Sequence, residues 1–497
     1  MHDAPVTQTP LGRDTPDAGT PFSARLAAIG AFVFVGLVML LQQLPHVFPG
    51  APEPPEAGVT APEQGDEFTM QAVMLVKLAN VVRDGSGKVQ DGERLMNLAE
   101  TPGQTLVERV RTAVVAGEVV GAEEALRRLD AVGTEIAAAD AQSEDAPPAG
   151  LDADIATLRR IYGGETVDDA EREELIARHG YFAKLALVHD APRTDPTRER
   201  LTGGGIPLVL TLTAVMVVVT GAFIAAVVLF IVGVIRFSSG RIRPRFTPPL
   251  PGGSVFLETV AVMAIAFLAL QAVKLAIATA FVKEGERAPE WLIVFSLATQ
   301  WLLVAVPFYP LLRGVPWPEL KRRIGWTRGE GVFREIGAGL GAYFATLPFL
   351  FVAIGVSLFI LFVRALVDGG NGGPAAPDNP VAELLGSGSP LLLILVFLLA
   401  TVWAPFVEES VFRGALYRHL RSWWGVVPSA VVTAIAFGVM HGYPFFLLLP
   451  VIVLGFNFSL MREWRGSLIG PMVTHGLHNA TLLAIVGPLM WQMRIPG

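Results

Sequence analysis

The sequence predicts an all-α protein that crosses a membrane many times, and three observations carry this prediction. The 497-residue chain is 52% hydrophobic with a mean hydropathy of +0.51, above the roughly 45–50% apolar content of soluble domains. Its apolar residues are gathered in runs of the length that a helix needs to cross a bilayer. The short loops between these runs collect Lys and Arg. We therefore expect about nine transmembrane helices, with a helical soluble insert between the first and the second.

The N-terminal part of the chain divides into a tail and an anchor. Residues 1–22 mix Pro, Thr, Asp and Gly without an apolar period, which is typical of a disordered tail. Residues 23–48 hold the first apolar run, at 26–44. Pro and Glu follow this run in place of a small-residue cleavage site, so we interpret 23–48 as an uncleaved membrane anchor and not as a signal peptide.

Residues 49–204 are polar and Ala-rich, and we interpret them as a helical insert outside the cytoplasm. Pro- and Gly-rich pieces interrupt the insert and predict flexible joints. Its histidines, His179 and His189, are interpreted as surface or core residues and not as ligands. Helical periodicity is clearest in three stretches: 70–82, 106–129 and 152–162.

The rest of the chain divides into a transmembrane bundle at 205–380 and a final segment at 381–497. The runs from residue 426 onward are shorter or interrupted by Gly and Pro. The predicted spans after the anchor are 206–235, 255–282, 291–312, 336–363, 391–404, 426–440, 445–460 and 468–490.

Loop charges orient these spans, because short cytoplasmic loops are enriched in Lys and Arg. Basic clusters follow the second, fourth, sixth and eighth runs, whereas the loop at 368–383 is acidic. We expect a multi-pass protein of the cell inner membrane with a cytoplasmic N-terminus. The net charge of -7 argues against nucleic acid as a partner, and the absence of Cys excludes disulfides, Cys-ligated metal sites and a thiol nucleophile.

Two adjacent glutamates, Glu408 and Glu409, lie at the end of an apolar run. A charged side chain in mid-bilayer costs roughly 2.5–3.5 kcal/mol, so such a pair indicates a functional site. On a helix Glu409 and Arg413 are four residues apart and can pair, while Glu408 points about 100° away. Glu408, desolvated and without that partner, is then the candidate general base. The alternative is a helix at the membrane surface whose acids are solvated.

Two further pairs share helical faces: Phe437 with His441, and His475 with Asn479. Together with Glu408 they supply what hydrolysis requires, namely a base, an imidazole that orients water, and donors for an oxyanion. Taken one at a time, such histidines are more often capping or packing residues. Half of the 8 histidines lie in the apolar C-terminal part: His419, His441, His475 and His478.

The order E-E-x-x-x-R, F-x-x-x-H and H-x-x-x-N on successive apolar runs resembles the CPBP family of intramembrane glutamic endopeptidases. That family contains the CAAX prenyl endopeptidases and bacterial relatives linked to bacteriocin processing or immunity. The resemblance covers residues 391–490 and implies that 381–497 is a CPBP-like catalytic core. It implies these roles: water activation by Glu408 with His441, oxyanion stabilisation by His475 and Asn479, and support by Glu409, Arg413 and Phe437.

The function that we predict is an intramembrane endopeptidase that hydrolyses membrane-associated or lipidated protein or peptide substrates within the lipid bilayer, without a cofactor. A non-catalytic scaffold or a bacteriocin-immunity-type protein is the alternative, because interhelical hydrogen bonds also hold helices together. A transporter is a third interpretation, to which Gln271 and Lys274 in an apolar run contribute. No inverted repeat or matching pair of broken helices supports transport.

A zinc site is the remaining alternative, since one Glu and two His form many catalytic zinc sites. The sequence contains no H-E-x-x-H, and neither His441 nor His475 has an acidic residue one turn away. If zinc held Glu408, no free carboxylate would remain as a base, because Glu409 is paired with Arg413. We therefore expect a metal-independent mechanism.

Overall fold

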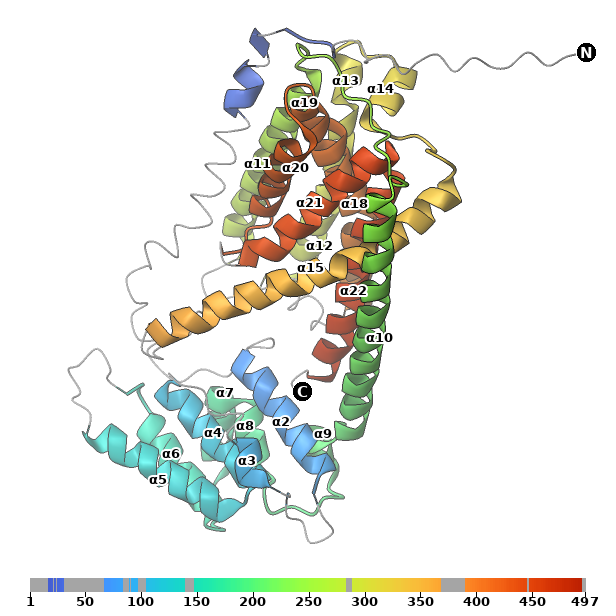
Figure 1. Cartoon of the computed structure of the whole chain (residues 1–497). Helices are drawn as coiled ribbons and strands as arrows, with labels where there is room; N and C mark the ends of the chain where they lie inside the picture. The colour runs from blue at the N-terminus through green and yellow to red at the C-terminus, as the bar shows by residue number, and fades with distance from the viewer. Residues whose placement is uncertain are drawn as a thin grey trace, which may run out of the picture. The chain divides into compact units, whose positions relative to one another are not determined.

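The computed structural model describes residues 17–20, 22–23, 25–30, 67–83, 89, 91–96, 104–138, 147–282, 288–367, 389–444 and 447–493. Within these ranges the chain forms helices joined by loops and no β-strand, and an isolated β-bridge joins Arg83 and Val89. The all-α prediction is therefore confirmed for the described chain (Figure 1). Two compact units are present. We call 1–47, 219–360 and 389–483 the membrane unit, and 48–218, 361–388 and 484–497 the insert unit.

The insert unit packs around α4, which contacts α2, α5, α6 and α8. Val110, Ala113 and Val114 of α4 are completely buried in its apolar core. A capping box starts this helix: the hydroxyl of Thr105 accepts from the backbone N–H of Glu108, whose carboxylate accepts from the N–H of Thr105. The helices are α2 (Glu67–Val81), α3 (Gly92–Met96), α4 (Leu106–Val119), α5 (Ala122–Ala138), α6 (Leu151–Tyr162), α7 (Asp169–His179), α8 (Tyr181–Leu187) and α9 (Pro196–Thr202).

His179 is a core residue of this unit, 2% exposed. Its Nε2 lies 3.1 Å from Oδ2 of the buried Asp154, and Arg178 donates to the same carboxylate at 2.8 Å. Burial by itself raises the pKa of Asp154, but the hydrogen bonds from His179 and Arg178 outweigh it and hold that pKa below its usual range. His179 therefore has a structural carboxylate partner, which agrees with the interpretation of a core residue.

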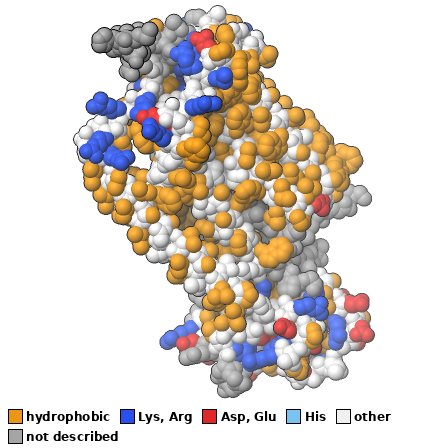
Figure 2. Space-filling model, turned by 90° about the vertical axis from the view of Figure 1, so that its right-hand side faces the viewer, with side chains coloured by type: hydrophobic (Ala, Val, Ile, Leu, Met, Phe, Trp, Pro, Cys, Tyr) orange, Lys and Arg blue, Asp and Glu red, His pale blue; other side chains and the backbone are white. Residues whose placement is uncertain are grey.

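The long helices of the chain include five that are long and apolar enough to cross a membrane: Pro196–Ser238, Val255–Phe281, Glu290–Leu312, Val332–Arg364 and Pro390–Arg421. Three of them lie mainly in the single helices α10 (Gly205–Ser238), α11 (Val255–Phe281) and α15 (Val332–Val367). The third stretch consists of α12 (Glu290–Thr299), the 3-10 helix η1 (Gln300–Phe308) and α13 (Tyr309–Leu312). The fifth stretch begins with α17 (Pro390–Leu398) and continues through further helical segments to Arg421. Figure 2 shows apolar side chains covering the surface of the membrane unit, with Lys and Arg gathered at one end. The protein is thus a multi-pass membrane protein.

The predicted count of nine spans is not confirmed. The predicted spans at 426–440, 445–460 and 468–490 are helices, namely α20 (Val426–Val439), α21 (Leu448–Arg465) and α22 (Ile469–Gln492), but they are shorter or more polar than the five. Most of the predicted anchor at 26–44 lies outside the described residues. The insert's placement outside the cytoplasm stays a prediction.

Residues 17–20 belong to the segment that the sequence predicts to be a disordered tail, but they pack onto the membrane unit. Asp17 is 8% exposed, and its Oδ1 lies 2.6 Å from a guanidinium nitrogen of Arg323 and 2.9 Å from one of Arg418. The carbonyl of Ala18 accepts from the backbone N–H groups of Ser254 and Val255. The prediction differs from the structure here because these basic partners are distant in sequence.

Candidate active site

The two glutamates lie on a helix that changes its winding on both sides of them. The π-helical segment η2 (Leu399–Trp403) precedes α18 (Ala404–Glu409), and a second π-helical segment, η3 (Ser410–Leu416), follows before α19 (Tyr417–Arg421). π-helical turns are rare and occur frequently at functional sites. These segments are absent from the sequence-based prediction, because periodicity does not separate them from a regular helix.

The first π-helical segment has a local cause and a tertiary partner. Pro405 has no backbone N–H, so the carbonyls one turn before it lose a donor within the helix. Asn479 of α22 supplies one, because its Nδ2 donates to the carbonyl of Ala400 at 2.7 Å. The predicted oxyanion donor is thus partly engaged with the backbone, and one of its two N–H hydrogens stays available.

The predicted ion pair of Glu409 and Arg413 is present in a completely buried setting. Arg413 Nη1 lies 3.0 Å from Glu409 Oε1, and both side chains are 0% exposed. Arg413 Nη2 also donates to the carbonyl of Gly455 in α21 at 2.8 Å. The guanidinium carbon lies 4.4 Å from the ring centre of Phe437 and 5.0 Å from that of Phe458. These cation–π contacts stabilise a charge that is removed from water.

His475 of α22 connects the two glutamates. Its Nδ1 lies 2.9 Å from Glu409 Oε1, and its Nε2 lies 3.9 Å from Glu408 Oε2. A carboxylate that pairs with a guanidinium accepts hydrogen bonds, so we assign Nδ1–H as the donor. The ring of Phe458 stacks on the imidazole at 5.2 Å with an interplanar angle of 20° and fixes its orientation. The bond between His475 and Glu409 is absent from the sequence-based prediction.

Glu408 has a different environment from its neighbour. Its side chain is 20% exposed, and its Oε2 is buried without a hydrogen-bond partner among the described residues. Glu409 is held by Arg413 and His475, whereas the nearest basic nitrogen to Glu408 that the structure records is His475 Nε2. Two adjacent carboxylates therefore have separate surroundings, as helical phase predicted.

His441 follows the end of α20 and faces the same region. Its Nδ1 lies 2.8 Å from the carbonyl of Phe437, so Nδ1 carries the proton and Nε2 is left with the lone pair in the neutral ring. The rings of Phe437 and His441 are 4.7 Å apart in edge-to-face contact. The ring of Phe437 also lies 5.8 Å from that of His475, so both imidazoles contact one aromatic ring, and His441 itself is exposed.

Two polar residues of this region, Trp326 and Ser410, were not identified from the sequence. Trp326 Nε1 donates to Ser410 Oγ at 2.9 Å, and the Trp326 ring stacks on Phe406 at 5.5 Å. His478 Nδ1 is buried without a partner among the described residues, and its ring is 6.1 Å from that of Tyr343. Ser410 follows the glutamate pair directly, but nothing in the sequence connects it with Trp326.

The described residues contain no group of three or more His, Asp or Glu side chains arranged to hold a metal ion. His475 directs one nitrogen at each glutamate, and His441 Nδ1 is engaged with a carbonyl. That the reaction needs no metal ion stays a prediction.

The fold and these contacts describe a multi-pass helical membrane protein with a centre of two glutamates, an arginine and two histidines, of which Glu409, Arg413 and His475 are buried. Residues 390–481 match the model of the family described as type II CAAX prenyl endopeptidase Rce1-like. The family resemblance of the motifs is thereby confirmed, and the matched segment contains all of the candidate site residues. Because this is a protease family, the match supports a membrane protease.

A curated relative is similar to this chain over 91 residues. The chain is 32% identical over 91 residues to the "Uncharacterized protein YpbD" of Bacillus subtilis (strain 168). The aligned part is 18% of this chain and 43% of YpbD, so the chain spans less than half of the length of this relative. No solved structure matches the chain.

Proposed function

We propose that the protein is an intramembrane endopeptidase of the glutamic type, with Glu408 as the general base. The observation that carries the proposal is the unpartnered Oε2 of Glu408 beside His475 Nε2. Their 3.9 Å separation is too long for a direct hydrogen bond and suits one bridging water. Glu409 is held by Arg413 and His475, so the two carboxylates take different roles.

The chemical step follows from these contacts. Glu408 removes one proton from the water, and Nε2 of His441 accepts the water's other hydrogen and orients it, while His475 in its protonated form donates through Nε2. The water oxygen attacks the scissile carbonyl carbon, and the negative charge forms on the carbonyl oxygen. The C–N bond then breaks, and the proton on Glu408 passes to the leaving amine. General-base catalysis is typically worth about 10² to 10⁴ in rate.

Stabilisation of the oxyanion is assigned to α22. His475 Nε2, when protonated, and the remaining N–H of Asn479 are the candidate donors, both presented by one helix. Loss of one such donor typically costs about 10² to 10³ in kcat. Glu409 and Arg413 act as positioning residues, because they hold His475 through Nδ1. The substrates that we propose are membrane-associated or lipidated proteins or peptides, cut in the cell inner membrane.

The test compares membrane-protein termini in cells that carry the wild type, Glu408→Gln or the control Glu93→Gln. Glu93 is an exposed glutamate of α3 in the insert unit, so the control makes the same chemical change away from the site. We expect a set of new termini with wild type and control that disappears with Glu408→Gln. Identical termini in all three strains, with Glu408→Gln present at normal level, would contradict the proposal.

A non-catalytic scaffold is the second candidate, and the contacts between helices favour it. His475 to Glu409, Arg413 to Gly455 and Asn479 to Ala400 each join two helices. A scaffold needs these bonds, but Glu408 contributes none of them. Loss of function on Glu408→Gln with unchanged thermal stability therefore distinguishes the enzyme from the scaffold.

The predicted orientation is tested by adding one cysteine to a chain that has none. A cysteine in place of Gly240, in the basic loop after α10, should be labelled by an impermeant reagent only after the cells are opened. Labelling at this position in intact cells would reverse the proposed orientation.

A further inference from the structure

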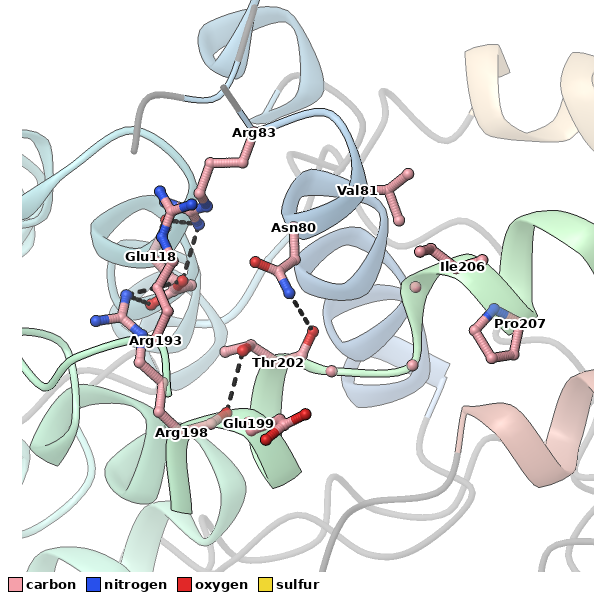
Figure 3. A pocket seen from close by; sticks show the side chains of 13 residues that line it. Asn80, Val81, Arg83, Glu118, Arg193, Arg198, Glu199, Thr202, Ile206 and Pro207 are labelled. Atoms are coloured by element: carbon pink, nitrogen blue, oxygen red, sulfur yellow. Dashed lines mark hydrogen bonds and ion pairs between the residues drawn. The ribbon is translucent and has the colours of Figure 1, made fainter. Parts of the chain in front are cut away.

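A pocket of about 460 Å³ lies in the insert unit where the insert ends and α10 begins (Figure 3). Its walls come from the end of α2, from α4, from α9 and from the first residues of α10. None of the residues that line it takes part in the proposed reaction. Three positively charged residues line it, Arg83, Arg193 and Arg198. Two negatively charged residues, Glu118 and Glu199, line it as well.

Positive charge exceeds negative charge around the one buried carboxylate of the pocket. Glu118 Oε1 lies 2.8 Å from Arg83 Nη2, and Glu118 Oε2 lies 2.9 Å from Arg198 Nη2. Figure 3 shows the arginines gathered around Glu118, with Glu199 turned away from them. Arg193, an exposed residue, adds a third guanidinium to this group.

Electrostatics supports a place for a further anion. Burial lowers the pKa of Arg83, and repulsion from Arg193 and Arg198 adds to this effect, whereas Glu118 opposes it. The net result is a pKa below the usual range of an arginine. An anion in the pocket would relieve the repulsion among the three guanidiniums. A guanidinium binds phosphate oxygens through two N–H groups, and because Arg83 and Arg198 already donate to Glu118, this contact falls to Arg193.

The other wall of the pocket is apolar and leads to a membrane span. Val81 is 37% exposed and Ile206 is 66% exposed. Pro207 follows, and Leu210 on the next turn is 64% exposed. Ile206, Pro207 and Leu210 lie within the stretch Pro196–Ser238, which is long and apolar enough to cross a bilayer. The pocket therefore combines guanidinium groups with an apolar rim that continues into a helix of membrane-spanning length.

The start of α10 adds donors to the same wall. Gly204 has a φ of +82°, which glycine adopts without strain, and a Cβ on Gly205 would collide with the carbonyl of Lys77. These glycines let the start of α10 lie against α2. The first backbone N–H groups of α10 have no partner within that helix.

We propose that this pocket binds the phosphate-bearing headgroup of an anionic membrane lipid, with Arg193 as the residue that contacts the phosphate. Arg198 is engaged by Glu118 and by the carbonyls of His189 and Ala191, so it shapes the pocket. The acyl chains would lie along Ile206 and Leu210. A soluble phosphate compound has the same charge but nothing to cover this apolar rim.

The test uses the full chain purified in detergent and measures bound lipid by native mass spectrometry. The probes are phosphatidylglycerol, which is anionic, phosphatidylcholine, which is zwitterionic, and soluble glycerol phosphate. Arg193→Gln removes the proposed contact without removing a partner of Glu118. Arg200→Gln is the matched control, because Arg200 is an exposed arginine of α9 that does not line the pocket.

We expect wild type and Arg200→Gln to prefer phosphatidylglycerol, and Arg193→Gln to bind it about tenfold more weakly, as for the loss of one charge-assisted hydrogen bond. Glycerol phosphate should bind at least tenfold more weakly than the lipid. Equal affinity of Arg193→Gln and Arg200→Gln for phosphatidylglycerol would overturn the proposal. Equal binding of phosphatidylcholine, or tighter binding of glycerol phosphate, would overturn the assignment to an anionic lipid.

Discussion

Replacement of Arg413 by alanine should destabilise the membrane unit far more than replacement of Glu408 by glutamine. Arg413→Ala leaves the carboxylate of Glu409 without its guanidinium, and breaking a completely buried pair costs about 3–5 kcal/mol. The carbonyl of Gly455 loses one donor but keeps the hydroxyl of Ser459, so this loss adds little. His475 remains on Glu409 and limits the loss, so we expect a total of about 3–5 kcal/mol.

The expected fall in the unfolding temperature is roughly 6–20 °C, at about 2–4 °C for each kcal/mol in a domain of this size. Glu408→Gln breaks no hydrogen bond that the structure records, so its unfolding temperature should stay within about 2 °C of the wild type. The assay heats the full chain in detergent and follows the loss of the soluble peak in size-exclusion chromatography.

Arg334→Ala is the control, because Arg334 is an exposed arginine at the start of α15. It should unfold like the wild type. If Glu408→Gln lowers the unfolding temperature as much as Arg413→Ala does, the separation of a chemical and a supporting glutamate is wrong. The same holds if Arg413→Ala is as stable as Arg334→Ala.

Three further outcomes are expected. Treatment with a strong chelator should not reduce proteolysis, and elemental analysis should find less than one zinc per chain. Activity that is lost to the chelator and restored by zinc would instead make Glu408 a metal ligand. Because the pKa of Asp154 is lowered in the folded insert, its carboxylate stabilises the insert above the unfolded pKa, and this stabilisation is lost as pH falls through the folded pKa. Asp154→Asn should therefore make the insert easier to cleave by protease at pH 7, with the difference from wild type shrinking below about pH 4; a pH-independent difference would contradict the linkage. Trp326→Phe keeps the stacking but removes the donor to Ser410, so it should cost about 1 kcal/mol in thermal unfolding, and Ser410→Ala should add little to it.

Local relations were predictable from the sequence, because they depend on spacing along one helix. The pairing of Glu409 with Arg413 needs only residues four apart, and the structure contains it. The bond from His475 to Glu409 joins residues 66 positions apart and depends on how α22 docks. The bond from Asn479 to Ala400 spans 79 positions and accompanies a π-helical turn that periodicity does not indicate.

The number of spans was harder to predict for a related reason. A helix that packs against other helices can carry paired charges and small polar residues, which lower its mean hydropathy. At the end of α21, Arg465 is paired with Glu335, and Arg421 is paired with Glu463. Hydropathy alone therefore does not separate a polar spanning helix in a bundle from a helix at the surface.

The ion pairs of Asp17 join the N-terminal segment to residues far along the chain. Asp17 is bound to Arg418, 401 positions later, and both residues belong to the membrane unit. The helices α2 to α9 of the insert unit lie between them in sequence. A single cut in the insert would therefore yield two fragments that still share one folded body. Such a nicked protein should migrate as one particle in detergent and separate into two pieces only on denaturation, so the two halves can be produced as separate chains and joined by folding.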